Sequence, residues 1–168
     1  MVVRAAFAAE KSRLTNYQER REHHAFLKYI KDRQRYRRED FGLHHSPNES
    51  PKASERKKHA SLGTSPGYPD LILHRAFALD GHRYAGLAIE MKRVRWGYQG
   101  VDKLDQQIAR AVAQGKDNEY AEHIRNQALW LARLRANMFV AEFARGCWEA
   151  VALTEMCYGA YAGSLPWE

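Results

Sequence analysis

The chain has 168 residues, of which 45% are hydrophobic and 11% aromatic, and this composition excludes an intrinsically disordered protein. Its length suits one domain with a single core, and we expect that domain to span residues 1–168 with its core at about 14–158. A formal net charge of +7 favours polyanionic partners such as nucleic acid.

The hydrophobic pattern alternates between helical and strand periodicity along the chain. We predict helices at 14–38, 101–114, 119–136 and 148–158, and strands at 71–79, 84–92 and 138–144. The polar stretch before the first strand is predicted as a loop with a short helical turn at 53–58, and DGH at 80–82 as the turn of a hairpin. This order predicts an α/β fold in which helices flank a sheet.

Charged side chains interrupt the two apolar strands of this hairpin. Glu90 and Lys92 point to the same face of their strand, about 6.8 Å apart along it, because side chains alternate. Asp70 follows Pro69 at the start of the preceding strand, where hairpin pairing brings its carboxylate beside Glu90. An alternative is that Glu90 and Lys92 form the exposed face of an edge strand.

Two neighbouring carboxylates repel each other unless a positive charge lies between them. Mg²⁺ is such a charge, because it takes one or two carboxylates together with water and phosphate oxygens. Lys92 could then stabilise negative charge on an attacked phosphate or help to deprotonate water. These residues therefore indicate metal-assisted hydrolysis of a phosphodiester.

Pro-Asp followed by Glu-x-Lys resembles the signature of the PD-(D/E)xK nuclease superfamily. Within that superfamily, four segments resemble the virus-type replication-repair nuclease (VRR-NUC) domain: SPNES, LGTSPGYPDLIL, GLAIEMKR and NQALWLARLRANMFVAEFARGCWEA. The resemblance implies a restriction-endonuclease-like α-β-β-β-α core with a mixed sheet. The segment at about 94–118 departs from compact members of the family, and we expect it to add an inserted helix.

The resemblance also implies a DNA endonuclease that depends on Mg²⁺ or Mn²⁺. Asp70, Glu90 and the Met91 carbonyl would bind the metal, and Lys92 would be the catalytic lysine. The family carries a glutamate on its first helix, which Glu22 matches best and Glu19 less well.

The helical pattern supports two of these residues independently. Glu22 continues the apolar face of Phe26, Tyr29 and Ile30, and the alternative is that it caps that face at the solvent edge. Gln127 falls on the apolar stripe of the helix at 119–136. It is predicted either to orient the lysine or the scissile region, or to be an ordinary buried amide.

Several residues are predicted to contact DNA. Three of them lie in RVRWGYQG at 93–100, directly after the strand predicted at 84–92, and the other three lie before the strand predicted at 71–79. The aromatic residues of RVRWGYQG could instead anchor the inserted helix. The predicted set is Arg93, Arg95, Trp96, Asn48, Lys58 and Ser65, of which Asn48 is alternatively a turn-forming residue. The basic run KYIKDRQRYRR at 28–38 either follows a DNA backbone or is a solvated helix face.

The remaining residues favour no other chemistry. The histidine pairs at 23–24 and 44–45 lack zinc-ligand spacing, and we expect the two cysteines, Cys147 and Cys157, to be buried reduced thiols. The N-terminus acquires charge too early for a signal peptide, and no apolar run is long enough to span a membrane. We therefore expect a soluble cytoplasmic protein.

Together these features predict a structure-specific DNA endonuclease, similar to a Holliday-junction resolvase and working as a homodimer on branched DNA. The alternative is a catalytically silent nucleic-acid-binding module or a partner subunit.

Overall fold

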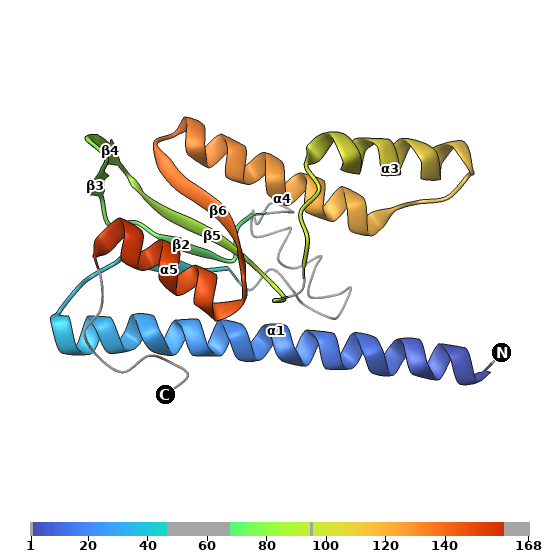
Figure 1. Ribbon diagram of the computed structural model, residues 1–168, viewed down its shortest axis with the longest axis horizontal. Coiled ribbons are helices and arrows are strands. Elements are labelled where there is room, and N and C mark those ends of the chain that lie inside the picture. The colour runs from blue at the N-terminus through green and yellow to red at the C-terminus, as the bar shows by residue number, and fades with distance from the viewer. Residues whose placement is uncertain (1, 47–67, 95, 160–168) are drawn as a thin grey trace. The chain divides into compact units, whose positions relative to one another are not determined.

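The computed structural model describes residues 2–46, 68–94 and 96–159, and side chains from residue 18 onward except that of residue 19 (Figure 1). The described elements, in chain order, are α1 (Val2–Arg37), β1 (Leu43–His45), β2 (Leu71–Leu73), β3 (Phe77–Leu79), β4 (His82–Tyr84), β5 (Gly86–Lys92), α3 (Val101–Ala113), α4 (Glu119–Ala136), β6 (Phe139–Arg145) and α5 (Gly146–Tyr158). In this part of the chain, no helix is both long enough and apolar enough to cross a membrane.

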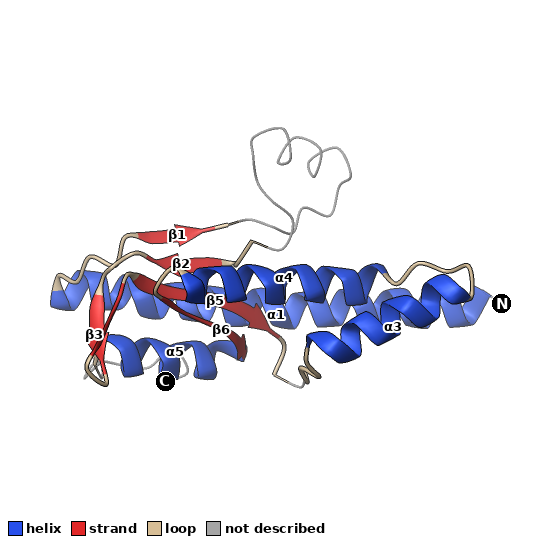
Figure 2. Cartoon of the chain, turned by 90° about the horizontal axis from the view of Figure 1, so that it is seen from above, coloured by secondary structure: helices blue, strands red, loops and turns tan. Residues whose placement is uncertain are grey.

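Four strands form the main sheet in the order β1-β2-β5-β6 (Figure 2). β1 pairs antiparallel with β2, and β2 pairs antiparallel with β5. The connection from β5 to β6 passes through α3 and α4, and it makes the sheet a mixed one. The predicted α/β fold with a mixed sheet and an inserted helix, which is α3, is therefore confirmed.

The hairpin differs from its predicted form, because each of its two long strands is divided. β3 and β4 form a separate two-stranded ribbon in which Leu79 pairs with His82 and Phe77 with Tyr84. In the main sheet, Leu73 pairs with Leu87. Three residues, 74–76, therefore stand opposite two, 85 and 86, which is the offset of a β-bulge and shifts the pairing by one residue.

Gly86, the first residue of β5, lies where the ribbon ends and the main sheet begins. A Cβ atom on Gly86 would collide with the carbonyl oxygen of Leu73 and lie 2.7 Å from Cε1 of Phe139. The amide of Ala85, meanwhile, donates a hydrogen bond of 2.7 Å to the carbonyl of Met138. Absence of a side chain at residue 86 thus allows the backbone of β2 and the Phe139 ring to approach β5 closely.

The chain divides into two compact units, and β5 and β6 each contribute residues to both of them. Unit 1 comprises residues 1–41, 91–96 and 143–168, and unit 2 comprises residues 42–90 and 97–142. In unit 1, α1 packs against α5, and in unit 2, α3 packs against α4 (Figure 1). Because apolar side chains recur every three or four residues on these helices, each presents one face to its neighbour.

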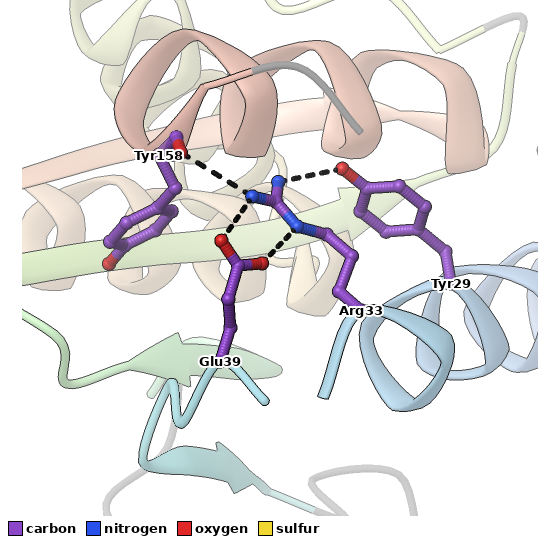
Figure 3. A network of polar contacts seen from close by, with 4 residues as sticks. All are labelled: Tyr29, Arg33, Glu39 and Tyr158. Atoms are coloured by element: carbon purple, nitrogen blue, oxygen red, sulfur yellow. Dashed lines mark hydrogen bonds and ion pairs between the residues drawn. The ribbon is translucent and has the colours of Figure 1, made fainter. Parts of the chain in front are cut away.

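Unit 1 contains a fully buried arginine, Arg33, on the inner face of α1 (Figure 3). Its guanidinium donates to both oxygens of Glu39 at 2.6 and 3.0 Å, to the hydroxyl of Tyr29 at 3.1 Å and to the carbonyl of Tyr158 at 3.4 Å. It also lies over the ring of Phe41. Burial by itself lowers the pKa of Arg33, but the hydrogen bonds to Glu39 and Tyr29 outweigh it, and the pKa is raised. The network joins the C-terminal ends of α1 and α5.

Candidate active site

The core of the candidate site lies on β5, the only described strand of the main sheet that carries two charged side chains at alternate positions. β5 has β2 on one side and β6 on the other, so it is an interior strand. Glu90 is 1% exposed and Lys92 is 7% exposed. The alternative that Glu90 and Lys92 form an exposed face of an edge strand is therefore wrong. Charged side chains are rarely buried unless they are paired.

Asp70 stands opposite Glu90 on the neighbouring strand. Leu71 pairs with Ile89 in the antiparallel ladder, and Asp70 is one residue further along in the same register. Its main-chain N–H donates a 3.2 Å hydrogen bond to Oε2 of Glu90. The predicted juxtaposition of Asp70 with Glu90 is thus present. The bulge produces it, because without the one-residue shift Asp70 would stand opposite Met91.

The carbonyl of Asp70 is held from the other side of its strand. It accepts a 2.8 Å hydrogen bond from the N–H of Ser46, a buried residue directly after β1. Both main-chain polar groups of Asp70 are therefore used to fix its backbone. The residue as a whole is buried, with 7% of its surface exposed.

Gln127 of α4 brings an amide to the same carboxylate. α4 starts at Asn118, whose side chain accepts a hydrogen bond from the N–H of Ala121, and its buried stripe includes Ile124, Gln127 and Leu131. The Nε2 atom of Gln127 donates to Oε1 of Glu90. Both oxygens of Glu90 are thus oriented by donors, one from β2 and one from α4.

The other end of the Gln127 amide is unsatisfied. Its Oε1 atom is buried and has no hydrogen-bond partner among the residues that the structure describes. Leaving a buried acceptor unpaired costs about 1–3 kcal/mol, so the position favours a bound donor such as a water molecule. A metal-bound water is one such donor, and a buried carboxylate pair suits an oxygen-preferring cation.

Metal-ligand side chains are otherwise sparse. Within residues 2–46, 68–94 and 96–159, no group of three or more His, Cys, Asp or Glu side chains is arranged to hold a metal ion. A cation at Asp70 and Glu90 would therefore take part of its coordination from main-chain oxygen, water or substrate. Mg²⁺ usually binds in this way.

Glu22 belongs to unit 1, where it is half-buried and meets the start of α5. Its Oε2 atom accepts a 2.7 Å hydrogen bond from the N–H of Cys147. Gly146 has φ +75°, and a Cβ atom there would lie 2.8 Å from Val94 and 3.2 Å from Glu22 Oε2. The carboxylate thus satisfies a free amide at the N-terminus of α5, where the helix dipole also favours a negative charge. Its role as a metal ligand stays a prediction.

The predicted DNA-binding residues are distributed as follows. Arg93 is exposed directly after β5. Trp96 is buried, with its ring centroid 4.8 Å from that of Phe143, which favours a role as an anchor over a role in stacking on bases. The other four, Asn48, Lys58, Ser65 and Arg95, lie outside the described residues, as does the side chain of Glu19.

Both cysteines are buried free thiols, as predicted. Burial raises the pKa of Cys147 and that of Cys157 to about 12, and the charge of Glu22 adds to the effect at Cys147. Neither thiol is therefore a reactive thiolate at neutral pH.

Sequence comparison alone identifies no relative. No family model matches the chain, and no curated protein matches it significantly. Among solved structures, one described as a VRR_NUC domain protein is similar over 84% of this chain and 88% of its own, with 20% sequence identity and a TM-score of 0.52. The fold expected from the Pro-Asp and Glu-x-Lys motifs is confirmed: this chain has the fold of a VRR_NUC domain.

Proposed function

We propose that this chain is a metal-dependent nuclease that hydrolyses phosphodiester bonds in DNA, with its active site at Asp70, Glu90 and Lys92. The observation that carries the proposal is the pair of buried carboxylates on neighbouring strands, with Gln127 donating to one of them. The fold shared with a VRR_NUC domain protein and the net charge of +7 support it.

Asp70, Glu90 and the main-chain carbonyl of Met91 are the groups that would hold Mg²⁺ or Mn²⁺, and the family resemblance adds Glu22 as a further predicted ligand. When bound, such an ion polarises a phosphate oxygen and lowers the pKa of its bound water. The protein's part is to hold Glu90 in one orientation, through the amide of Asp70 and the side chain of Gln127. Carboxylates fixed in this way bind a metal without first losing conformational freedom.

Lys92 and Arg93 follow on the same strand end. The Lys92 ammonium, two residues from Glu90, would stabilise negative charge that develops on the attacked phosphate, or assist in removing a proton from water. Arg93 is exposed and would bind a neighbouring phosphate of the DNA backbone.

A cleavage assay with purified variants tests this proposal. Labelled linear, flap and four-way DNA substrates are incubated with Mg²⁺, Mn²⁺ or EDTA. We expect metal-dependent cutting by the wild type, and a loss of several orders of magnitude in Lys92→Ala and Glu90→Gln. Lys103→Ala, an exposed lysine of α3, is the control and should cut normally. Normal cutting by either site variant would rule out the site, and no cutting by any protein would favour a silent DNA-binding module.

The same assay shows which DNA structure the protein prefers to cut. We propose that the active form is a homodimer on branched DNA, because cutting two opposed strands of a junction requires two active sites, most simply related by a two-fold axis. Light scattering should then give twice the mass of one chain, and cuts on a four-way junction should be paired. A monomer that makes one asymmetric nick would instead favour a flap or nicking nuclease.

A further inference from the structure

The outer face of α1 carries a row of basic side chains that the proposed active site does not use. Arg20, His24, Lys28, Lys31 and Arg35 are all exposed, and they follow one another at steps of four, four, three and four residues. This spacing keeps them on one side of a helix with 3.6 residues per turn. We call these five residues the α1 basic stripe.

The stripe lies opposite the buried face of the helix. Phe26, Tyr29, Ile30 and Arg33 are fully buried on the other side of α1. No Asp or Glu among the described side chains shares the stripe, because Glu22 falls on the buried side and Asp32 on the flank. Unlike a solvated helix face of alternating charge, the stripe holds no acidic side chain to offset its arginines and lysines.

None of its members forms an ion pair with a described residue. The ion pairs at Arg33, Arg125, Arg135 and Arg145 all involve cations outside the stripe. Arg35 lies over the ring of its neighbour Tyr36. The charges of the stripe are therefore available to an external polyanion.

Its dimensions suit a nucleic-acid duplex. From position 20 to position 35 the helix rises about 22 Å, a length over which B-form DNA carries about 13 phosphates. An anionic membrane fits less well, because helices that lie on membranes insert an apolar face. The apolar face of α1 is buried in unit 1 and cannot do so.

We propose that the α1 basic stripe is a second nucleic-acid surface, which binds the backbone of a duplex segment other than the one at the active site. Glu22, a predicted metal ligand, is on the opposite side of the same helix, so one stretch of backbone would not contact both Glu22 and the stripe. The inference rests on the proposed nuclease function for the identity of the polyanion. Bound in this way, DNA would be held without sequence preference, since phosphates carry no sequence information.

Binding in EDTA tests the stripe independently of cleavage. Fluorescence anisotropy with a labelled 30-base-pair duplex would compare wild type with Lys28→Ala/Lys31→Ala/Arg35→Ala. The slope of log K against log[salt] should become shallower by about 3, since each phosphate contact contributes about 0.9. At low salt the affinity should fall at least tenfold. Because all three side chains are exposed and Ala favours helix, the variant should fold, which circular dichroism would verify.

A matched control separates the stripe from net charge. Arg83→Ala/Lys103→Ala/Arg110→Ala removes the same three charges from exposed positions of unit 2. It should change the slope by less than 1. Equal effects of the two triple variants would overturn the proposal, as would equal stripe-dependent binding to vesicles containing anionic phospholipid.

Cleavage then distinguishes this inference from the nuclease proposal. If both hold, the stripe variant should need more DNA for half-maximal rate but cut at the wild-type rate when DNA is saturating. If the wild type binds duplex through the stripe but never cuts, the stripe is upheld and the nuclease function fails. If the wild type cuts DNA and the stripe variant binds like wild type, the stripe is refuted and the nuclease function stands.

Discussion

The main-chain N–H of Asp70 donates a hydrogen bond of 3.2 Å to the carboxylate of Glu90. One strand thus orients the side chain of the next, and the two acids are fixed relative to each other before any ligand arrives. Preorganisation of this kind reduces the conformational entropy that binding would otherwise cost.

Substitution of Gln127 should lower both the affinity for Mn²⁺ and the rate of DNA cleavage. Gln127→Ala removes the donor to Oε1 of Glu90, and loss of such an outer hydrogen bond typically costs about 10–100-fold in metal affinity or activity. Isothermal titration with Mn²⁺ would measure the affinity, and the cleavage assay the rate. Asn126→Ala, the neighbouring residue outside the buried stripe of α4, is the control. Unchanged Mn²⁺ affinity in Gln127→Ala would show that the amide is an ordinary core residue.

Gly86→Ala should destabilise the protein. The new methyl group would collide with the carbonyl of Leu73 and the ring of Phe139, and overpacking of this kind typically costs about 1–3 kcal/mol. Urea unfolding would measure the loss. Gly97→Ala is the matched control, because a Cβ atom there meets nothing within 4 Å. Similar midpoints for Gly86→Ala and the wild type would mean that the sheet adjusts at this position.

Arg33→Met should lower the free energy of unfolding more than most substitutions. It leaves the carboxylate of Glu39 largely buried without its cation, and breaking a buried pair in this way costs about 3–5 kcal/mol. The double variant Arg33→Met/Glu39→Leu should recover part of the loss, because no charge is then left unpaired. Chemical denaturation of the two variants would show it. A double variant less stable than Arg33→Met would mean that Glu39 has another essential contact.

Alkaline pH should weaken the contribution of the two thiols to stability. The folded-state pKa of Cys147 and that of Cys157 are raised to about 12 from 9.0. A raised pKa contributes stability that is fully present below pH 9 and is lost as the pH rises toward 12. The stability difference between wild type and Cys147→Ala/Cys157→Ala should therefore narrow from pH 8 to pH 10. Urea unfolding at both values would measure it, and a constant difference would contradict the assigned burial.

The sequence allowed much of the site to be predicted. Alternation along a strand places Glu90 and Lys92 on one face, and Pro-Asp before the paired strand brings Asp70 close to them. The register that sets Asp70 opposite Glu90, and not opposite Met91, depends on the bulge. Helical spacing likewise assigned Gln127 to a buried stripe. Each of these positions depends on residues close in sequence or joined by one hairpin.

Other features depend on distant residues and could not be predicted. The bulge lies where Gly86 allows Leu73 and Phe139 to approach closely. The sequence around Gly86 does not indicate that Phe139, more than 50 residues later, packs against it. The three residues of β1 are polar or half-exposed and carry no strand periodicity. Glu22 accepts from an amide of α5, 125 residues later, so its partner is set by where that helix starts.

The bulge between the two ladders also has an evolutionary consequence. The β2–β5 ladder fixes the position of Asp70 opposite Glu90. The β3–β4 ribbon is a separate ladder on the other side of the bulge. Homologues could therefore lengthen or shorten the ribbon by paired residues without displacing either acid. Sequence variation among homologues should then concentrate in the ribbon, while Asp70 and Glu90 keep their alignment.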